Sequence, residues 1–175
     1  MIDRLFRLLY LLAYRAMRVY WAMARPRTHG ALVALWSGGE ILLVKNSYTR
    51  YHSLPGGYVR RRESALEAAR RELLEEVGVS LGSGELSRVV DLHHLWEGKR
   101  DHVEIFEAEV AQRPEVRVDG REVVAAAFYP PAGALALDLF PPVRQAIERR
   151  ARGTAGAGEV GSAVAAGAAE ARPGG

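Results

Sequence analysis

Hydrophobic and polar positions divide the chain into three segments. Residues 1–25 are mainly apolar and carry arginines that lie within about 80° on a helical wheel, which predicts an amphipathic helix. Residues 26–152 alternate short apolar runs with turn-forming residues and predict one compact domain. Residues 153–175 are mostly Ala and Gly. They lack the large apolar side chains that offset ordering entropy, so we expect a disordered tail.

The pattern inside residues 26–152 predicts strands around a central helix. Two apolar runs, over residues 30–36 and 40–45, flank a Ser-Gly-Gly sequence and indicate a β-hairpin. Further strands are predicted over residues 86–94, 102–110 and 122–129, with residues 97–101 linking the first two. Helices are predicted over residues 63–77, ended by Gly78, and over residues 142–150. We therefore expect an α/β fold in which helices sandwich a mixed β-sheet.

Composition and charge exclude several kinds of functional site and partner. The chain of 175 residues has no cysteine, which excludes disulfides, thiolate metal sites and thiol nucleophiles. The net charge of +3 is small, and no basic surface interleaved with aromatic residues is evident, so a nucleic-acid partner is not expected. We expect a cytoplasmic protein. Lysine occurs only at positions 45 and 99.

The predicted helix over residues 63–77 carries three carboxylates on one face. Glu72, Glu75 and Glu76 follow i, i+3, i+4 spacing, beside an apolar stripe formed by Leu66, Ala69, Leu73 and Val77. Crowded carboxylates repel one another, and a divalent ion such as Mg²⁺ or Mn²⁺ would offset that repulsion. The alternative is a solvated acidic helix end, which the helix dipole disfavours near a C-terminus.

The same residues fit a longer pattern. It runs Gly57, five residues, Glu63, seven residues, Arg71-Glu72-Leu73, one residue, Glu75-Glu76, one residue, Gly78-Val79. This pattern resembles the complete signature of the Nudix hydrolases, and the similarity extends from about residue 28 to residue 150. The resemblance implies an α/β/α sandwich with a mixed β-sheet. It also implies metal-dependent hydrolysis of a diphosphate linkage by attack of water on phosphorus.

The resemblance also implies roles for single residues. Glu72, Glu75, Glu76 and the carbonyl of Gly56 would hold Mg²⁺, with Mn²⁺ as the alternative ion. Arg71 and Glu63 would orient these glutamates, although a simple surface ion pair is the alternative interpretation. Two positions depart from the common family pattern, His52 in place of a tryptophan and Arg62 in place of a glycine.

The general base and the substrate contacts are less strongly indicated. Glu72 could polarise the attacking water, but many Nudix enzymes use a glutamate from a later loop. Glu122 is our candidate, with Glu97 and Glu104 as competitors. In the segment over residues 46–52, Tyr48 or Tyr51 could stack on a base and Arg50 could contact a phosphate, unless these residues only pack the loop.

Histidines suggest a second metal site only weakly. His93 and His94 are adjacent on a predicted strand and so point to opposite faces. Together with His102 they are better explained as core or surface residues.

The amino-terminal helix allows three interpretations. The arginines at positions 4, 7, 15 and 18 form a narrow stripe on an otherwise apolar helix. The helix could dock on the domain, form a homodimer, or lie on an anionic membrane surface as a peripheral contact. Its longest uncharged stretch, residues 8–14, is far shorter than the roughly 20 residues that span a bilayer.

We therefore expect a pyrophosphohydrolase acting on a nucleoside diphosphate linked to another moiety. The alternative is a non-catalytic Nudix module that binds a nucleotide-type ligand as a sensor or as a partner recruited to a membrane. The intact set of three carboxylates favours the enzyme, because a module that only binds does not need all three.

Overall fold

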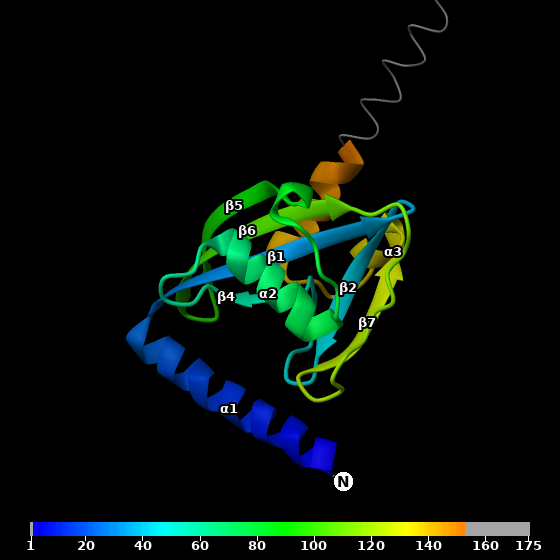
Figure 1. The fold of residues 1–175 in the computed structure, drawn as a ribbon. Helices are drawn as coiled ribbons and strands as arrows, with labels where there is room; N and C mark the ends of the chain where they lie inside the picture. Colours follow the sequence, from blue (N-terminus) through cyan, green and yellow to red (C-terminus); the bar gives the residue numbers. More distant parts are fainter. Residues whose placement is uncertain (1, 153–175) are drawn as a thin grey trace, which may run out of the picture.

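The computed structural model describes residues 2–152. The tail predicted over residues 153–175 lies outside these described residues. The chain begins with helix α1 (Ile2–Ala24) and continues into a domain built on one seven-stranded sheet. Figure 1 shows the sheet behind helix α2 (Ala65–Val77), with α1 crossing one end of the domain.

The sheet is mixed, as the sequence predicts. Strand β1 (Arg27–Ser37) runs parallel to β6 (Lys99–Glu109) along its whole length, and β6 pairs antiparallel with β5 (Ser87–Trp96). The other side of β1 is divided between two partners. It pairs with β4 (Gly56–Tyr58) near its start and with β2 (Glu40–Asn46) near its end. Strands β3 (His52–Ser53) and β7 (Val123–Tyr129) pair with β2.

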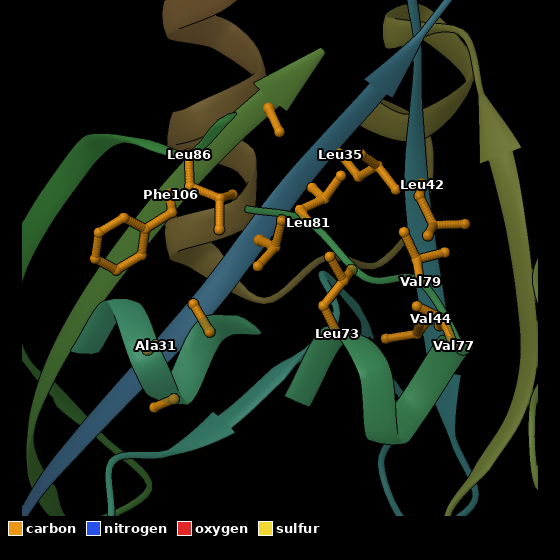
Figure 2. Packing of buried hydrophobic residues seen from close by; sticks show 14 of the residues in the cluster. Ala31, Leu35, Leu42, Val44, Leu73, Val77, Val79, Leu81, Leu86 and Phe106 are labelled. Carbon is orange, nitrogen blue, oxygen red and sulfur yellow. The ribbon is translucent and has the colours of Figure 1, made fainter. Parts of the chain in front are cut away.

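Helices cover both faces of this sheet, which confirms the expected α/β/α sandwich. On one face, Leu73 and Val77 of α2 are fully buried against Leu35, Leu42 and Val44 (Figure 2). On the other face, a helix over residues 141–152 buries Val143, Ala146 and Ile147 against Leu32, Ala34 and Trp36. These two clusters carry most of the apolar burial that stabilises the domain.

Local signals place α2 as predicted, within two residues. Ser64 is the N-cap and forms a capping box with Glu67, while Gly78 ends the helix in the left-handed conformation with φ 73°. The buried stripe is slightly rotated from the predicted one. Ala68 is fully buried beside Ala69, and Leu66 lies at the edge of the cluster.

The link between β5 and β6 is shorter than predicted. It consists of Glu97 and Gly98, both with positive φ (49° and 85°), and Trp96 pairs directly with Lys99. Such a two-residue turn matches the twist of a β-hairpin. The charged residues 99–101, which we expected in the link, therefore belong to β6. Strands β3 and β4 and the short helices α3 (Pro131–Leu135) and η1 (Ser83–Glu85) were not predicted from the sequence.

Candidate active site

The three carboxylates of α2 lie together at one end of the cleft between α2, β4 and α1. Glu72, Glu75 and Glu76 all line a cavity of about 600 Å³. Glu76 points back to the backbone, where its Oε2 accepts a hydrogen bond of 2.9 Å from the amide of Gly56. The predicted acidic face is therefore a wall of a cavity, in which Glu72 is largely buried and Glu75 stays half exposed.

Two glycines bring the backbone of β4 against these carboxylates. Gly56 has φ 152°, and a Cβ there would lie 2.3 Å from the carbonyl oxygen of Ala31. A Cβ on Gly57 would lie 2.5 Å from Oε1 of Glu72. Only glycine permits this approach, so the Gly-Gly pair places backbone groups and carboxylates side by side.

Arg71 ties the glutamates together. Its Nε donates to Glu63 Oε1 at 2.8 Å, and its Nη2 donates to Glu63 Oε2 at 3.0 Å. Its Nη1 contacts Glu72 and lies 3.3 Å from Glu75, while Nη2 also reaches the carbonyl oxygen of Tyr58. The rigid guanidinium thus fixes two of the three predicted metal ligands.

Electrostatics at the site call for a cation. Burial raises the pKa of Glu76 to about 8, and the charges of Glu72 and Glu122 add to this shift. By contrast, the hydrogen bonds from Arg71 hold the pKa of Glu63 at about 2. Neighbouring carboxylates repel one another when all are ionised, and a bound divalent cation such as Mg²⁺ would offset this repulsion.

Helix α1 forms the opposite wall of the cavity. Its lining residues are Tyr10, Ala13, Tyr14, Met17 and Trp21. The helix is attached at both ends. Near its start, Arg7 donates to the carbonyl oxygen of Gly120 at 2.8 Å, and Asp3 pairs with Arg121 at 3.1 Å. Near its end it rests on the turn between β5 and β6.

The docked and outer faces of α1 differ. Trp21 is buried against the domain, and Tyr14 donates to both carboxylate oxygens of Glu97 at 2.6 and 2.7 Å. The outward side exposes large apolar residues, namely Leu5, Leu8, Leu9, Leu12, Val19 and Met23. In the part of the chain that the structure describes, no helix is long and apolar enough to cross a membrane. Helix α1 docks on the domain through the face that carries Tyr14 and Trp21, as one of the three predicted alternatives states.

The candidate base lies in the same cavity. Glu122 lines it and accepts a 2.8 Å hydrogen bond from the hydroxyl of Tyr48. Burial and the Glu122 carboxylate raise the pKa of Tyr48, which keeps this hydroxyl protonated as a donor. Of the competitors, Glu97 lines the cavity but is engaged by Tyr14, whereas Glu104 is outside the lining.

The predicted substrate contacts separate into two groups. Tyr48 and Tyr51 line the cavity. Arg50 does not belong to the lining. Its side chain is 75% exposed, lies 3.4 Å from Asp138, and stacks on the ring of Tyr51. Arg50 thus stands at the outside of the loop that carries the two tyrosines.

Three histidines form a row across the sheet. His29, His102 and His93 are register partners on β1, β6 and β5, and their rings stack with centroids 4.2 and 4.0 Å apart. The sequence did not predict His29 as part of this group, because it lies far from His93 and His102 along the chain and joins them only through strand pairing. His94 lies on the opposite side of β5, 3.6 Å from Asp101, as the alternation along a strand requires.

Carboxylates beside this row already have cationic partners. Glu104 accepts from His29 at 2.9 Å and from Arg88 at 2.8 Å. Asp91 lies 2.8 Å from His102 and 3.1 Å from Arg88. Although ligand atoms of His29, His102 and Glu104 lie within 4.8 Å of one another, Arg88 supplies the positive charge that a metal would bring. That these histidines serve as core or surface residues stays a prediction.

Lys99 carried no sequence signal for a place in the site, and Arg62 lies in the loop before α2, outside the cavity lining. Lys99, one of two lysines, is buried and lines the cavity. Arg62, which replaces a common family glycine, has φ 69°. The left-handed backbone at this position explains why glycine is frequent there.

The family model described as NUDIX domain matches residues 26–150. The fold is similar to the crystal structure of a MutT NUDIX hydrolase from Burkholderia pseudomallei, with 26% identity and a TM-score of 0.62. That match covers 70% of this chain and 96% of the other. No curated protein sequence matches the chain significantly.

More distant structures share the fold. A C. elegans Ap4A hydrolase is 20% identical, with a TM-score of 0.63, over 74% of this chain and 98% of that one. The E. coli dihydroneopterin triphosphate pyrophosphohydrolase is 22% identical, with a TM-score of 0.58, over 69% and 92%. The names of these two enzymes specify different substrates, and their similarity to this chain is one of fold. The Nudix family typically depends on divalent metals. Because the family model spans well over half of its length, the chain belongs to the Nudix hydrolase family.

Proposed function

We propose that this protein hydrolyses a diphosphate linkage in a nucleoside diphosphate joined to another moiety, by attack of water on phosphorus. The observation that supports this most directly is the joint placement of Glu72, Glu75 and Glu76 against the Gly56–Gly57 backbone inside one cavity. A diphosphate needs charge neutralisation and a positioned water, and this wall supplies the residues for both.

Glu72, Glu75, Glu76 and the carbonyl of Gly56 would hold Mg²⁺, with Mn²⁺ as the alternative. When bound, such an ion neutralises phosphate oxygens and acidifies water. The protein supplies the orientation. Arg71, fixed by Glu63, prevents Glu72 from turning away from the cavity.

Glu122 is our candidate for the general base that takes a proton from the attacking water. Its carboxylate lies in the cavity, and the hydrogen bond from Tyr48 limits its rotation. Tyr48 and Tyr51 offer aromatic surfaces to the group attached to the diphosphate. Phosphate contact by Arg50 stays a prediction that requires a movement of its exposed side chain.

Glu76→Gln tests this function. Formation of the nucleoside monophosphate product from a panel of nucleoside diphosphate derivatives with Mg²⁺ should fall by at least about 100-fold, because a metal ligand is lost. Glu67→Gln is the matched control, since Glu67 lies on the same helix and glutamine preserves its capping box. Equal turnover of Glu76→Gln and wild type would refute the site.

The same panel separates the enzyme from the alternative module. A module that only binds would retain a panel compound in equilibrium dialysis without cleaving it. Turnover of any panel compound that depends on Mg²⁺ and is lost in Glu76→Gln would exclude a purely binding role.

A second role for α1 is peripheral contact with an anionic membrane surface. The outer strip of α1 is apolar, with Leu8 50% and Leu12 51% exposed. Arg4 and Arg15 border this strip without a carboxylate partner among the described residues. An apolar strip flanked by arginines suits an interfacial helix on acidic lipids.

Flotation with vesicles containing phosphatidylglycerol tests this role. The wild-type chain should float, and the double variant Leu8→Glu, Leu12→Glu should remain at the bottom. If the wild type does not float but forms a concentration-dependent dimer that the variant abolishes, the strip is a homodimer interface instead. A cytoplasmic location agrees with either result and remains a prediction.

A further inference from the structure

Lys99 is a buried cation in the wall of the cavity. It is the first residue of β6, directly after the Glu97–Gly98 turn, and is only 6% exposed. Its ammonium donates a 3.1 Å hydrogen bond to the hydroxyl of Tyr58 and lies 4.1 Å from the centre of the Trp21 ring. Among residues 2–152, no carboxylate oxygen lies within 4.0 Å of this nitrogen.

The contacts of Lys99 leave its charge incompletely compensated. An ammonium has three donors, and the tyrosine hydroxyl accepts one. Burial of a charge is costly unless it is paired. Asp101, two residues along the same face of β6, instead accepts from Thr28 at 2.5 Å. Because Lys99 lines the cavity, its remaining donors can reach a ligand there.

Lys99 differs from the other cation that lines the described part of the cavity in having no carboxylate partner. Among residues 2–152, the only other cation that lines the cavity is Arg60, whose guanidinium lies 3.5 Å from Glu75. Once a divalent ion offsets the carboxylates of α2, Lys99 is, among the described lining residues, the cation without a carboxylate oxygen within 4.0 Å. An anion that extends from the metal-binding wall toward α1 meets this ammonium.

The two aromatic residues that contact the Lys99 ammonium, Tyr58 and Trp21, are both held in place by other parts of the domain. Tyr58 follows Gly57 on β4, and its carbonyl oxygen accepts from Arg71. Trp21 belongs to the end of α1 that packs on the turn, where a Cβ on Gly98 would lie 3.0 Å from the Trp21 carbonyl oxygen. The position of Lys99 thus depends on the metal-binding wall on one side and on α1 on the other.

We propose that Lys99 binds an anionic oxygen of the substrate phosphate that projects from the α2 carboxylates toward α1, and that Trp21 and Tyr58 position its ammonium for this contact. The proposal rests on the proposed function and adds a specificity-determining residue and a recognition role for α1. It predicts that ligands with two phosphate groups bind more tightly than ligands with one.

Nitrogen NMR of the full chain tests the contact directly. Because lysine occurs only at positions 45 and 99, a sample labelled with [¹⁵N]lysine gives two side-chain Nζ signals. The probe is methylenediphosphonate with Mg²⁺, a diphosphate analogue that cannot be hydrolysed. The Lys99 signal should shift on binding. The Lys45 signal should stay in place, since its ammonium contacts the carbonyl of Arg50 and does not line the cavity.

Calorimetry with the same probe separates the possible results. Lys99→Met keeps the apolar stem beside Trp21 and should weaken binding about tenfold or more, as expected for loss of a charge-assisted hydrogen bond. Lys99→Arg should recover most of this loss. Binding of phosphate, which has one phosphate group, should change much less.

Two outcomes would overturn the proposal. If Lys99→Met binds like wild type and the Lys99 signal does not shift, while Glu76→Gln loses affinity, the site is right and the role of Lys99 is wrong. If the wild type does not bind methylenediphosphonate with Mg²⁺ at all, the proposed function and the role of Lys99 fail together. The NMR result decides the question even if Lys99→Met does not fold.

Discussion

Arg71 and Glu63 form a two-bond fork, with Nε to Oε1 at 2.8 Å and Nη2 to Oε2 at 3.0 Å. Glu63 in turn accepts from the amide of Arg60 at 2.9 Å, so the loop before α2 is fixed to the middle of the helix. The remaining nitrogen of Arg71 is then directed at Glu72 and Glu75. Arg71 and Glu63, which are not predicted to contact the metal, therefore set the positions of two residues that are, Glu72 and Glu75.

Arg71→Lys should lower kcat/KM for Mg²⁺-dependent hydrolysis by about 10- to 100-fold, because one ammonium cannot replace the planar fork. The measurement is steady-state formation of the nucleoside monophosphate product over a range of Mg²⁺ concentrations. Arg70→Lys is the control, since Arg70 donates to the Leu81 carbonyl and does not touch the glutamates. Similar losses in both variants would contradict an orienting role for Arg71.

Glu122→Gln should lower kcat by about 100-fold or more with little change in KM, if Glu122 is the general base. Glu97→Gln should leave kcat close to wild type, because Tyr14 already occupies both oxygens of Glu97. Both residues line the cavity, so kcat and KM of the two variants are measured with the same substrate. A large loss in Glu97→Gln alone would transfer the role to that residue.

Binding of Mg²⁺ should release a proton from Glu76. The folded pKa of about 8 lies above the ordinary value of 4.5, so the folded metal-free protein holds a proton at pH 7 that the unfolded chain lacks. Its free energy of unfolding should accordingly fall as pH rises from about 5 to 8. A metal ion needs the ionised carboxylate and must displace this proton.

Calorimetric titration of Mg²⁺ at pH 7 in PIPES and in Tris measures this release. The apparent enthalpy should differ between the buffers by an amount that corresponds to nearly one proton in the wild type. In Glu76→Gln the difference should disappear. Identical enthalpies in both buffers for the wild type would show that Glu76 is already ionised.

Arg62→Gly should stabilise the domain by about 0.5–1 kcal/mol, since glycine adopts the left-handed conformation at φ 69° without the steric cost that other residues incur. Thermal unfolding followed by circular dichroism is the measurement. Arg61→Gly is the control at a neighbouring exposed position without positive φ, and it should be neutral or destabilising. A lower unfolding temperature for Arg62→Gly would mean that its side chain stabilises the loop in a way that outweighs the backbone.

The metal-binding wall could be predicted because its signals are local. The spacing of the glutamates, the N-cap at Ser64 and the left-handed residue Gly78 all act within a few positions of one another. The longer strands and the mixed character of the sheet could also be predicted, whereas β3 and β4 are too short to show an alternating pattern.

The rest of the site depends on contacts between distant segments. A wheel of α1 shows apolar residues on two sides, and only the structure shows that Trp21 faces inward while Leu12 faces outward. Lys99 lies in a charged sequence that is typical of an exposed turn. It is buried because α1 covers it, a tertiary effect that no local pattern reports.

Helix α1 touches the loop beside Glu122 through Asp3 and Arg7, and it touches the turn before Lys99 through Trp21. Between Asp3 and Trp21 a straight helix measures about 27 Å at 1.5 Å per residue. A tilt of only about 10° around Trp21 would then swing the far end by about 5 Å. Because Glu122 and Lys99 line the same cavity near opposite ends of this span, a small rotation at the Trp21 end would change the distance from α1 to Glu122 more than the distance from α1 to Lys99.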